Sequence, residues 1–142
     1  RIEVYDSNGN LKAVYGPALI IGSQVFSLSV QASSIRILNI SNTDSKNYYG
    51  VLTLNSSNPN GFSSVSIYLC NSTLCSSTPI TLPSGSSQTS EVTLPPGTSY
   101  IRLDYSASSA GASADIYIHL RYSSLPSQGG VLAIYPIEIH VG

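Results

Sequence analysis

The feature that most constrains the fold is a two-residue alternation of apolar and polar side chains that recurs along the sequence. It is clearest in the segment DIYIHLRY, residues 115–122. One face of this segment holds Ile116, Ile118, Leu120 and Tyr122, and the other holds Asp115, Tyr117, His119 and Arg121. Because successive side chains of a β-strand point to opposite faces of a sheet, the pattern predicts a half-buried antiparallel strand. No segment shows a convincing helical period.

Other segments of the same kind predict an all-β chain. They are residues 2–5, 11–15, 25–30, 35–41, 48–55, 64–70, 79–82, 91–94, 100–105 and 131–141. Turn residues such as Asn58-Pro-Asn-Gly61 and Pro95-Pro-Gly97 separate them. Short strands punctuated by glycine and proline predict an antiparallel β-sandwich. The segment LPPGTSYIRLDY, residues 94–105, resembles the turn and late strand of immunoglobulin-like extracellular modules.

Composition limits the classes of function. The 142 residues suit one domain, and 42% hydrophobic residues are enough for a core. Only 9% are charged, against about 25% in an average globular protein, and 28 residues are serine. The net charge of −1 gives no electrostatic footprint for nucleic acid or an anionic membrane. No apolar run reaches the ~20 residues that span a bilayer, and the lack of a signal peptide is expected of a processed mature chain.

The two cysteines, Cys70 and Cys75, enclose the triplet Asn71-Ser-Thr73. A zinc site needs about four ligands, and only His119 and His140 could complete one. A redox pair would be C-x-x-C beside a helix. We therefore predict a disulfide that closes a tight hairpin end and stabilises the fold by roughly 2 kcal/mol.

Three sequons fit the acceptor pattern for N-linked glycans, at Asn39, Asn55 and Asn71. Each could arise by chance in a serine-rich chain. Together with a disulfide, they favour a glycosylated protein outside the cell, and glycans would hydrate a surface that carries little charge.

The sequence does not favour an enzyme. It has no nucleophile elbow, no H-E-x-x-H and no phosphate-binding glycine loop. Asp104 and Asp115 could share a site with His119, but a solvated polar face explains them more simply. We therefore expect no catalytic residues, no cofactor and no metal. The pair Tyr48-Tyr49 is the best candidate for a sugar-binding surface patch among the ten tyrosines.

Residues 1–17 allow two interpretations. They could form a terminal hairpin with a turn at Asn8-Gly9, or they could leave their own domain and pair in a groove of the next subunit. The candidate donor side chains are Ile2, Val4, Leu11, Ala13 and Val14. Each would contribute roughly 1.5–3 kcal/mol on burial. A C-terminal donor, residues 134–141, is an alternative.

The serine- and tyrosine-rich composition, the sequons, the cysteine pair and the alternating N-terminal segment resemble the subunits of archaeal surface filaments, above all the glycosylated threads of Sulfolobus-type organisms. The resemblance implies a pilin-like sandwich, residues 18–142, preceded by a donor-strand segment, residues 1–17. It implies an extracellular homopolymer with N-linked glycans, joined by donor-strand complementation and serving adhesion or biofilm contacts. The alternatives are a viral capsid or S-layer-like β-sandwich that packs through its faces, and a carbohydrate-binding module.

Overall fold

The computed structural model describes residues 2–15, 23–26, 32–107, 111–123, 125–126 and 133–141. These residues form β-strands without any helix. The strands are β1 (Ile2–Asp6), β2 (Leu11–Tyr15), β3 (Ser23–Phe26), β4 (Ala32–Asn42), β5 (Tyr48–Asn60), β6 (Phe62–Cys70), β7 (Ile80–Leu82), β8 (Val92–Leu94), β9 (Gly97–Ala107), β10 (Ser113–Ser123) and β11 (Ala133–Val141). Each predicted segment overlaps one of these strands, although segment 25–30 shares only residues 25 and 26 with β3. Residues 27–30 and 131–132 of the predicted segments lie outside the described residues.

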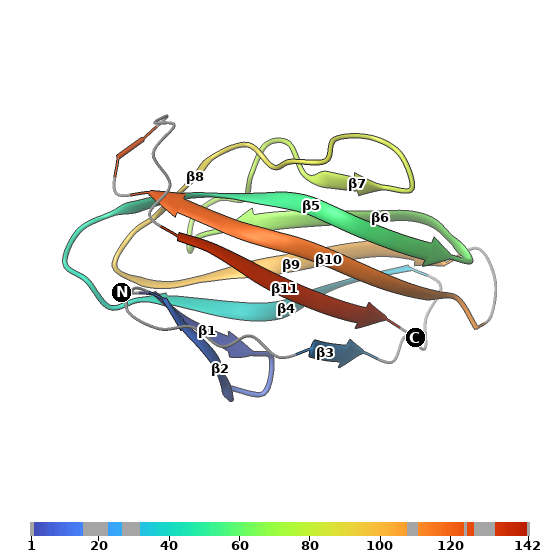
Figure 1. Ribbon diagram of the computed structural model, residues 1–142, viewed down its shortest axis with the longest axis horizontal. Coiled ribbons are helices and arrows are strands. Elements are labelled where there is room, and N and C mark those ends of the chain that lie inside the picture. Colours follow the sequence, from blue (N-terminus) through green and yellow to red (C-terminus); the bar gives the residue numbers. More distant parts are fainter. Residues whose placement is uncertain are drawn as a thin grey trace.

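The strands form two sheets that face each other (Figure 1). Sheet A has the order β2-β1-β4-β9-β6-β7, and sheet B has the order β3-β11-β10-β5-β8. All pairs are antiparallel except β3 with β11, which is parallel. If β1, β4, β9 and β6 are strands A, B, E and D, and β11, β10 and β5 are strands G, F and C, the strand order of the two sheets is that of an immunoglobulin-like sandwich. The predicted all-β sandwich is therefore confirmed.

The core lies between the sheets and follows the predicted alternation. In β10, Ile116, Ile118, Leu120 and Tyr122 are buried, whereas Asp115 is exposed. Edge-to-face aromatic pairs pack near the two ends of the core. Tyr48 and Tyr122 have ring centroids 5.5 Å apart at one end, and Phe62 and Tyr105 have centroids 6.1 Å apart at the other.

A β-bulge in β4 interrupts the alternation. Arg36 lies opposite Arg102 and Leu38 lies opposite Ile101, so Ile37 is an extra residue. Both Ile37 and Leu38 are consequently buried, at 0% and 1% exposure. The bulge explains why the sequence has two consecutive apolar residues within a strand that otherwise alternates.

β1 begins at one end of the sandwich, and β11 finishes at the other end (Figure 1). The loops at residues 43–47 and 71–79 lie at the same end as the beginning of β1, because Ile2 pairs with Asn42 and Cys70 pairs with Tyr100. β4 begins at the opposite end, where β9 finishes, because Ala32 pairs with Ser106.

Candidate assembly site at the N-terminal edges

The N-terminal hairpin is held by the side chain of Asp6. Its carboxylate accepts hydrogen bonds from the backbone N–H of Asn8 at 2.9 Å and of Asn10 at 2.8 Å, and from the Asn10 carboxamide at 3.2 Å. Gly9 has a φ of 85°, a left-handed conformation that glycine adopts without strain. Asp6 is 6% exposed, so these bonds satisfy a buried charge. The sequence Asp6-Ser-Asn-Gly-Asn10 therefore encodes a tight turn.

The hairpin lies on the edge of sheet A. β1 pairs with β4, with Val4 opposite Ile40 and Ile2 opposite Asn42. Val4 is fully buried, which contributes roughly 1.5–3 kcal/mol of transfer free energy. Leu11, at the beginning of β2, is 52% exposed. In the β1–β2 ladder, Ala13 is the partner of Val4 and Val14 that of Glu3.

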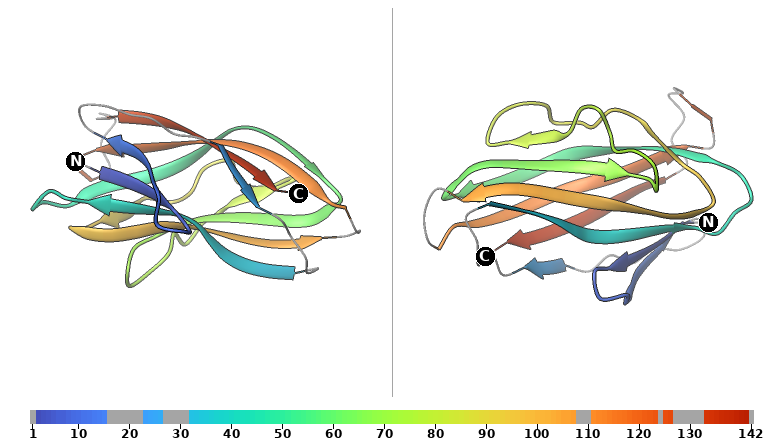
Figure 2. Two further views of the ribbon diagram at one scale, coloured as in Figure 1. Left: turned by 90° about the horizontal axis from the view of Figure 1, so that it is seen from below. Right: turned by 180° about the vertical axis from the view of Figure 1, so that it is seen from behind.

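A second strand, β3, which follows residues 1–17 in the sequence, covers the edge of β11 in sheet B. β3 pairs with β11, with Gln24 opposite Ile139 and Val25 opposite His140. β1 and β3 thus lie on one flank of the sandwich, at the edges that β4 and β11 would otherwise expose (Figure 2).

The segment predicted to be donated lies on its own sandwich in the single chain. This arrangement is the terminal-hairpin interpretation, and the turn at Asn8-Gly9 is present as that interpretation requires. Donation to a neighbour stays a prediction, as does the division of the chain at residues 17 and 18. β11 is a central strand between β10 and β3, so the alternative donor segment 134–141 is also placed within its own sheet.

The predicted disulfide between Cys70 and Cys75 is confirmed. It closes a loop that is also held by Asn71, whose carboxamide oxygen accepts hydrogen bonds from the backbone N–H of Thr73 and Leu74, both at 2.9 Å, and from the Thr73 hydroxyl at 3.0 Å. The Asn71 Nδ2 donates to the Thr93 carbonyl at 2.9 Å. Because both cysteines are oxidised, they do not provide the thiolate ligands of a metal site.

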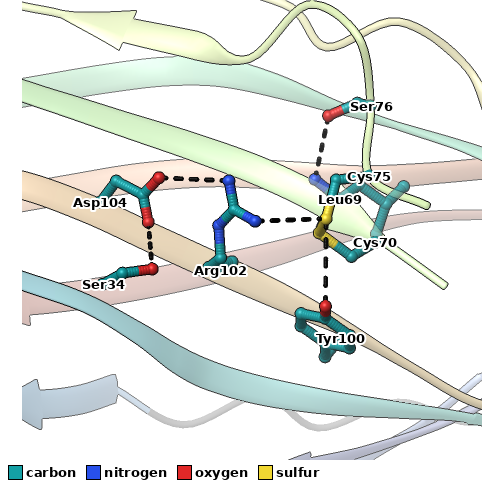
Figure 3. Close-up of polar contacts among 8 residues, drawn as sticks. All are labelled: Ser34, Leu69, Cys70, Cys75, Ser76, Tyr100, Arg102 and Asp104. Atoms are coloured by element: carbon teal, nitrogen blue, oxygen red, sulfur yellow. Dashed lines mark hydrogen bonds and ion pairs between the residues drawn. A yellow bond between two sulfur atoms is a disulfide. The ribbon is translucent and has the colours of Figure 1, made fainter. Parts of the chain in front are cut away.

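Arginine and tyrosine side chains cover the outer face of sheet A beside this disulfide (Figure 3). The Arg102 guanidinium lies 4.2 Å from the centre of the Tyr68 ring and donates to Asp104 at 3.1 Å and to the Cys75 sulfur at 3.6 Å. Arg36 stacks over Tyr100 with its Cζ atom 3.8 Å from the ring centre. Arg36 and Arg102 are cross-strand partners, so ring stacking and Asp104 offset the repulsion between two like charges.

Sequence reasoning did not predict this arginine–tyrosine face. The signal is nevertheless present, because Tyr100, Arg102 and Asp104 are the alternate residues of β9 that face away from the core. Ser34 donates a hydrogen bond to Asp104 and extends the contacts to β4 (Figure 3). The face is polar, and Arg102 both pairs with Asp104 and stacks on Tyr68.

The three predicted glycan acceptors differ in their surroundings. Asn55 is exposed on β5, Asn39 is half-buried in the middle of β4, and Asn71 is 6% exposed. Glycosylation at all three stays a prediction. The hydrogen bonds of Asn71 give that side chain a structural role that the sequon pattern does not reveal.

The side chains that could have formed a catalytic site, Asp104, Asp115 and His119, do not lie together. Asp104 lies in sheet A, whereas Asp115 and His119 lie in sheet B. Asp115 instead pairs with His140, with Oδ1 and Nδ1 2.7 Å apart, and Glu138 lies 3.7 Å from the other ring nitrogen. The hydrogen bond to Asp115 raises the pKa of His140. Within the described ranges, no three histidine, cysteine or acidic side chains form a metal-binding group.

The prediction of a surface patch at Tyr48-Tyr49 is wrong for Tyr48. Its side chain is 5% exposed, packs against Tyr122 and donates a hydrogen bond to Asp44. Burial, followed by this hydrogen bond, raises the pKa of Tyr48 to about 12. A ring that packs inside the core cannot act as a platform for a sugar.

Nothing in the described part of the chain is a helix long and apolar enough to cross a membrane.

Comparison with protein-family models and with curated protein sequences finds no match. Among solved structures, the N-terminal domain of PorA is similar, with a TM-score of 0.50 and 12% identity over 99% of this chain and 97% of that chain. The seventh PapD-like domain of human CEP192 gives a TM-score of 0.49 and 9% identity, over 99% and 82% of the two chains. The CooA pilin subunit of enterotoxigenic Escherichia coli gives 0.47 and 15%, over 99% and 97%. At such identities the likeness concerns the fold alone.

Proposed function

We propose that the chain is the structural subunit of a glycosylated filament outside the cell, in which each copy donates its N-terminal segment to the next. The observation that carries the proposal is the position of that segment. Within residues 1–17, β1 covers the edge of β4, and β3, which follows these residues in the sequence, covers the edge of β11 on the same flank. Removing residues 1–17 would leave the edge of β4 without its partner β1, and an unpaired strand edge favours pairing with another chain.

A neighbour's segment could occupy the same place with the same contacts. Exchange of an identical element between copies needs no new interface and therefore little free energy. When the exchange passes from one copy to the next without closing, the product is a linear polymer. The sequons and the disulfide support a location outside the cell, where disulfides persist and N-linked glycans are found.

An engineered disulfide that holds β1 on β4 of the same chain tests whether copies exchange their N-terminal segments. Glu3 and Ser41 are directly opposite each other in β1 and β4, so cysteines at both positions are within reach of a disulfide. We expect the oxidised double variant Glu3→Cys/Ser41→Cys to remain monomeric and to polymerise after reduction, as seen by electron microscopy. The single variants, treated in the same way, control for reduction of the native disulfide and for loss of the Asn39 sequon.

Filaments from the oxidised, locked variant would contradict the proposal. That result would favour copies that pack through the outer faces of their sheets, as in a capsid or S-layer lattice. A variant that is monomeric in both redox states would also count against exchange, provided that the single variants polymerise.

A further inference from the structure

The flank opposite the N-terminal edges is only partly covered. There, β8 pairs with residues 48–50 of β5. The loop before β8 extends this cover, because the Thr89 N–H donates to the Leu52 carbonyl at 2.9 Å and the Leu54 N–H donates to the Ser87 carbonyl at 2.7 Å. From residue 55 to residue 60, the neighbour of β5 among the described residues is β10 alone. The outer edge of this part of β5 is therefore open to pairing with another strand.

A β-bulge lies where the cover ends. Leu54 is opposite Ile118 and Ser56 is opposite Tyr117, so Asn55 is the extra residue. A bulge turns the side chain of the extra residue away from the regular alternation, and Asn55 is exposed. Asn55 is also the acceptor of the sequon Asn55-Ser-Ser57. A glycan attached here would stand at the beginning of the open edge.

Pro59 gives independent support for an edge that is kept unpaired. Proline has no backbone N–H to donate, and within sheets it is confined to positions where that missing donor would face solvent. Pro59 lies in β5 opposite Ala114 of β10. It therefore removes a donor from the open edge, which is a common way to discourage the pairing of edge strands.

The other two sequons are less suited to carry a glycan. The Asn71 side chain is 6% exposed and already makes four hydrogen bonds, one of them through the Nδ2 atom to which a glycan would be attached. Asn39 is half-buried in β4, with β1 on one side and β9 on the other. Asn55 alone combines exposure with a position on an uncovered edge.

We infer that Asn55 is the glycan acceptor, and that its glycan, together with Pro59, prevents the open edge of β5 from pairing with another copy. The inference rests on the extracellular, glycosylated part of the proposed function and is independent of strand exchange. In a filament, it would leave the N-terminal edges as the place where copies join.

Occupancy is tested on the full chain produced in a secretory host that attaches N-linked glycans. Ser57→Ala removes the Asn55 sequon but keeps the asparagine, and Thr73→Ala removes the Asn71 sequon in the same way. We expect Ser57→Ala to lose the mass of one glycan and Thr73→Ala to lose none, with the modified peptide mapped to Asn55. A glycan found on Asn71, or an unmodified Asn55, would overturn the inference.

The role of the glycan is tested in the exchange-locked background, so that polymerisation through the N-terminal segment does not contribute. There, Ser57→Ala should increase the aggregated fraction several-fold in light scattering. Adding Asn58→Lys should return that fraction to the level of the glycosylated chain, because a charge on the edge repels a second strand. If Ser57→Ala aggregates no more than the glycosylated chain, or if Asn58→Lys brings no rescue, edge protection is wrong even if filaments form as proposed.

Discussion

Gly50, in β5, shows how a single position sets the packing of side chains in the core. A Cβ atom added at Gly50 would lie 2.9 Å from Cδ1 of Leu94 and 3.4 Å from Cδ2 of Leu69. Both leucines are fully buried, so neither has free space into which to move. Interiors are packed as densely as organic crystals, and extra atoms force neighbouring side chains or the backbone to shift.

We therefore expect Gly50→Ala to lower the free energy of unfolding by about 1–3 kcal/mol, because overpacking strains the core. Urea unfolding followed by circular dichroism measures this change. Ser64→Ala, at an exposed position of β6, is the matched control and should stay within about 0.5 kcal/mol of the unsubstituted chain. Equal stability of the two variants would show that Leu94 and Leu69 relax without strain.

The His140 side chain makes the stability of the fold depend on pH, and the direction of this dependence follows from its pKa. The hydrogen bond to Asp115 raises its pKa above the ordinary value of 6.5, and Glu138 acts in the same direction. The folded state therefore binds the proton more tightly than the unfolded state. The resulting stabilisation of the fold is fully present below pH 6.5 and is lost as the pH rises through the raised pKa of His140.

We expect the melting temperature of the unsubstituted chain to exceed that of His140→Gln at acid pH, with a gap that closes as the pH rises within about 5 to 8. Differential scanning fluorimetry across this range is sufficient. Asp115→Asn should reduce the same gap, because it removes the acceptor. A gap that does not change with pH would mean that His140 contributes through packing, for example against Tyr117.

Among the structural elements, the loop between β6 and β7 is held twice, by the Cys70–Cys75 disulfide and by the side chain of Asn71. The disulfide closes a short loop, so its entropic contribution is about 2 kcal/mol. Asn71 is itself buried and accepts hydrogen bonds from two backbone N–H groups of the loop, and each such hydrogen bond contributes about 0.5–1.5 kcal/mol. The two devices are therefore of similar strength.

Asn71→Ala should consequently destabilise the fold about as much as Cys70→Ser/Cys75→Ser, by roughly 1–3 kcal/mol. Thermal unfolding of the two variants and of the triple variant measures the contribution of Asn71, the contribution of the disulfide, and the coupling free energy between them. Ser72→Ala is the control, since that side chain is exposed in the same loop and the change keeps the Asn71 sequon. If Asn71→Ala has no effect, water replaces the carboxamide as acceptor, and the loop depends on the disulfide alone.

The strands could be predicted because their physical signal is local. Alternation in residues 115–122 specifies one buried and one exposed face, and β10 has both. The close approach of Leu94 to Gly50 was not predictable, because it depends on β8 lying beside β5. Tyr48 was misjudged for the same reason. Its ring is buried by Tyr122, which is distant in sequence.

The candidate assembly site was predicted less completely than the strands. The Asn8-Gly9 turn and the Cys70–Cys75 disulfide follow from spacing alone. The parallel pairing of β3 with β11 does not, since no local pattern specifies which edge a short strand will join. Likewise, a sequon identifies an acceptor asparagine but carries no information on burial, which separates Asn55 from Asn71.

At the scale of the whole molecule, residues 1–17 can be removed from the edge of sheet A and supplied again as a separate peptide. We expect deletion of residues 1–17 to lower the melting temperature, because Val4 leaves a gap in the core and β4 loses its partner. A synthetic peptide of residues 1–17 should restore it in a concentration-dependent manner. By mass action, a peptide at 100 times its Kd restores about 2.7 kcal/mol.

A peptide with the same composition in scrambled order is the control for this complementation. It keeps the charge and the hydrophobic content but loses the turn and the alternation. If both peptides stabilise the truncated chain equally, or if neither does, the edge left by the deletion does not recognise the segment, and donation between copies would lack its physical basis.

The scarcity of charge, six basic and seven acidic residues among 142, also affects how copies respond to their surroundings. Dissolved ions change the behaviour of a protein mainly by screening its charges. Here there is little to screen, because hydroxyl and amide groups provide most of the outer polarity. Contacts between copies should therefore change little in strength as the ionic strength rises from about 0.01 M to 0.15 M.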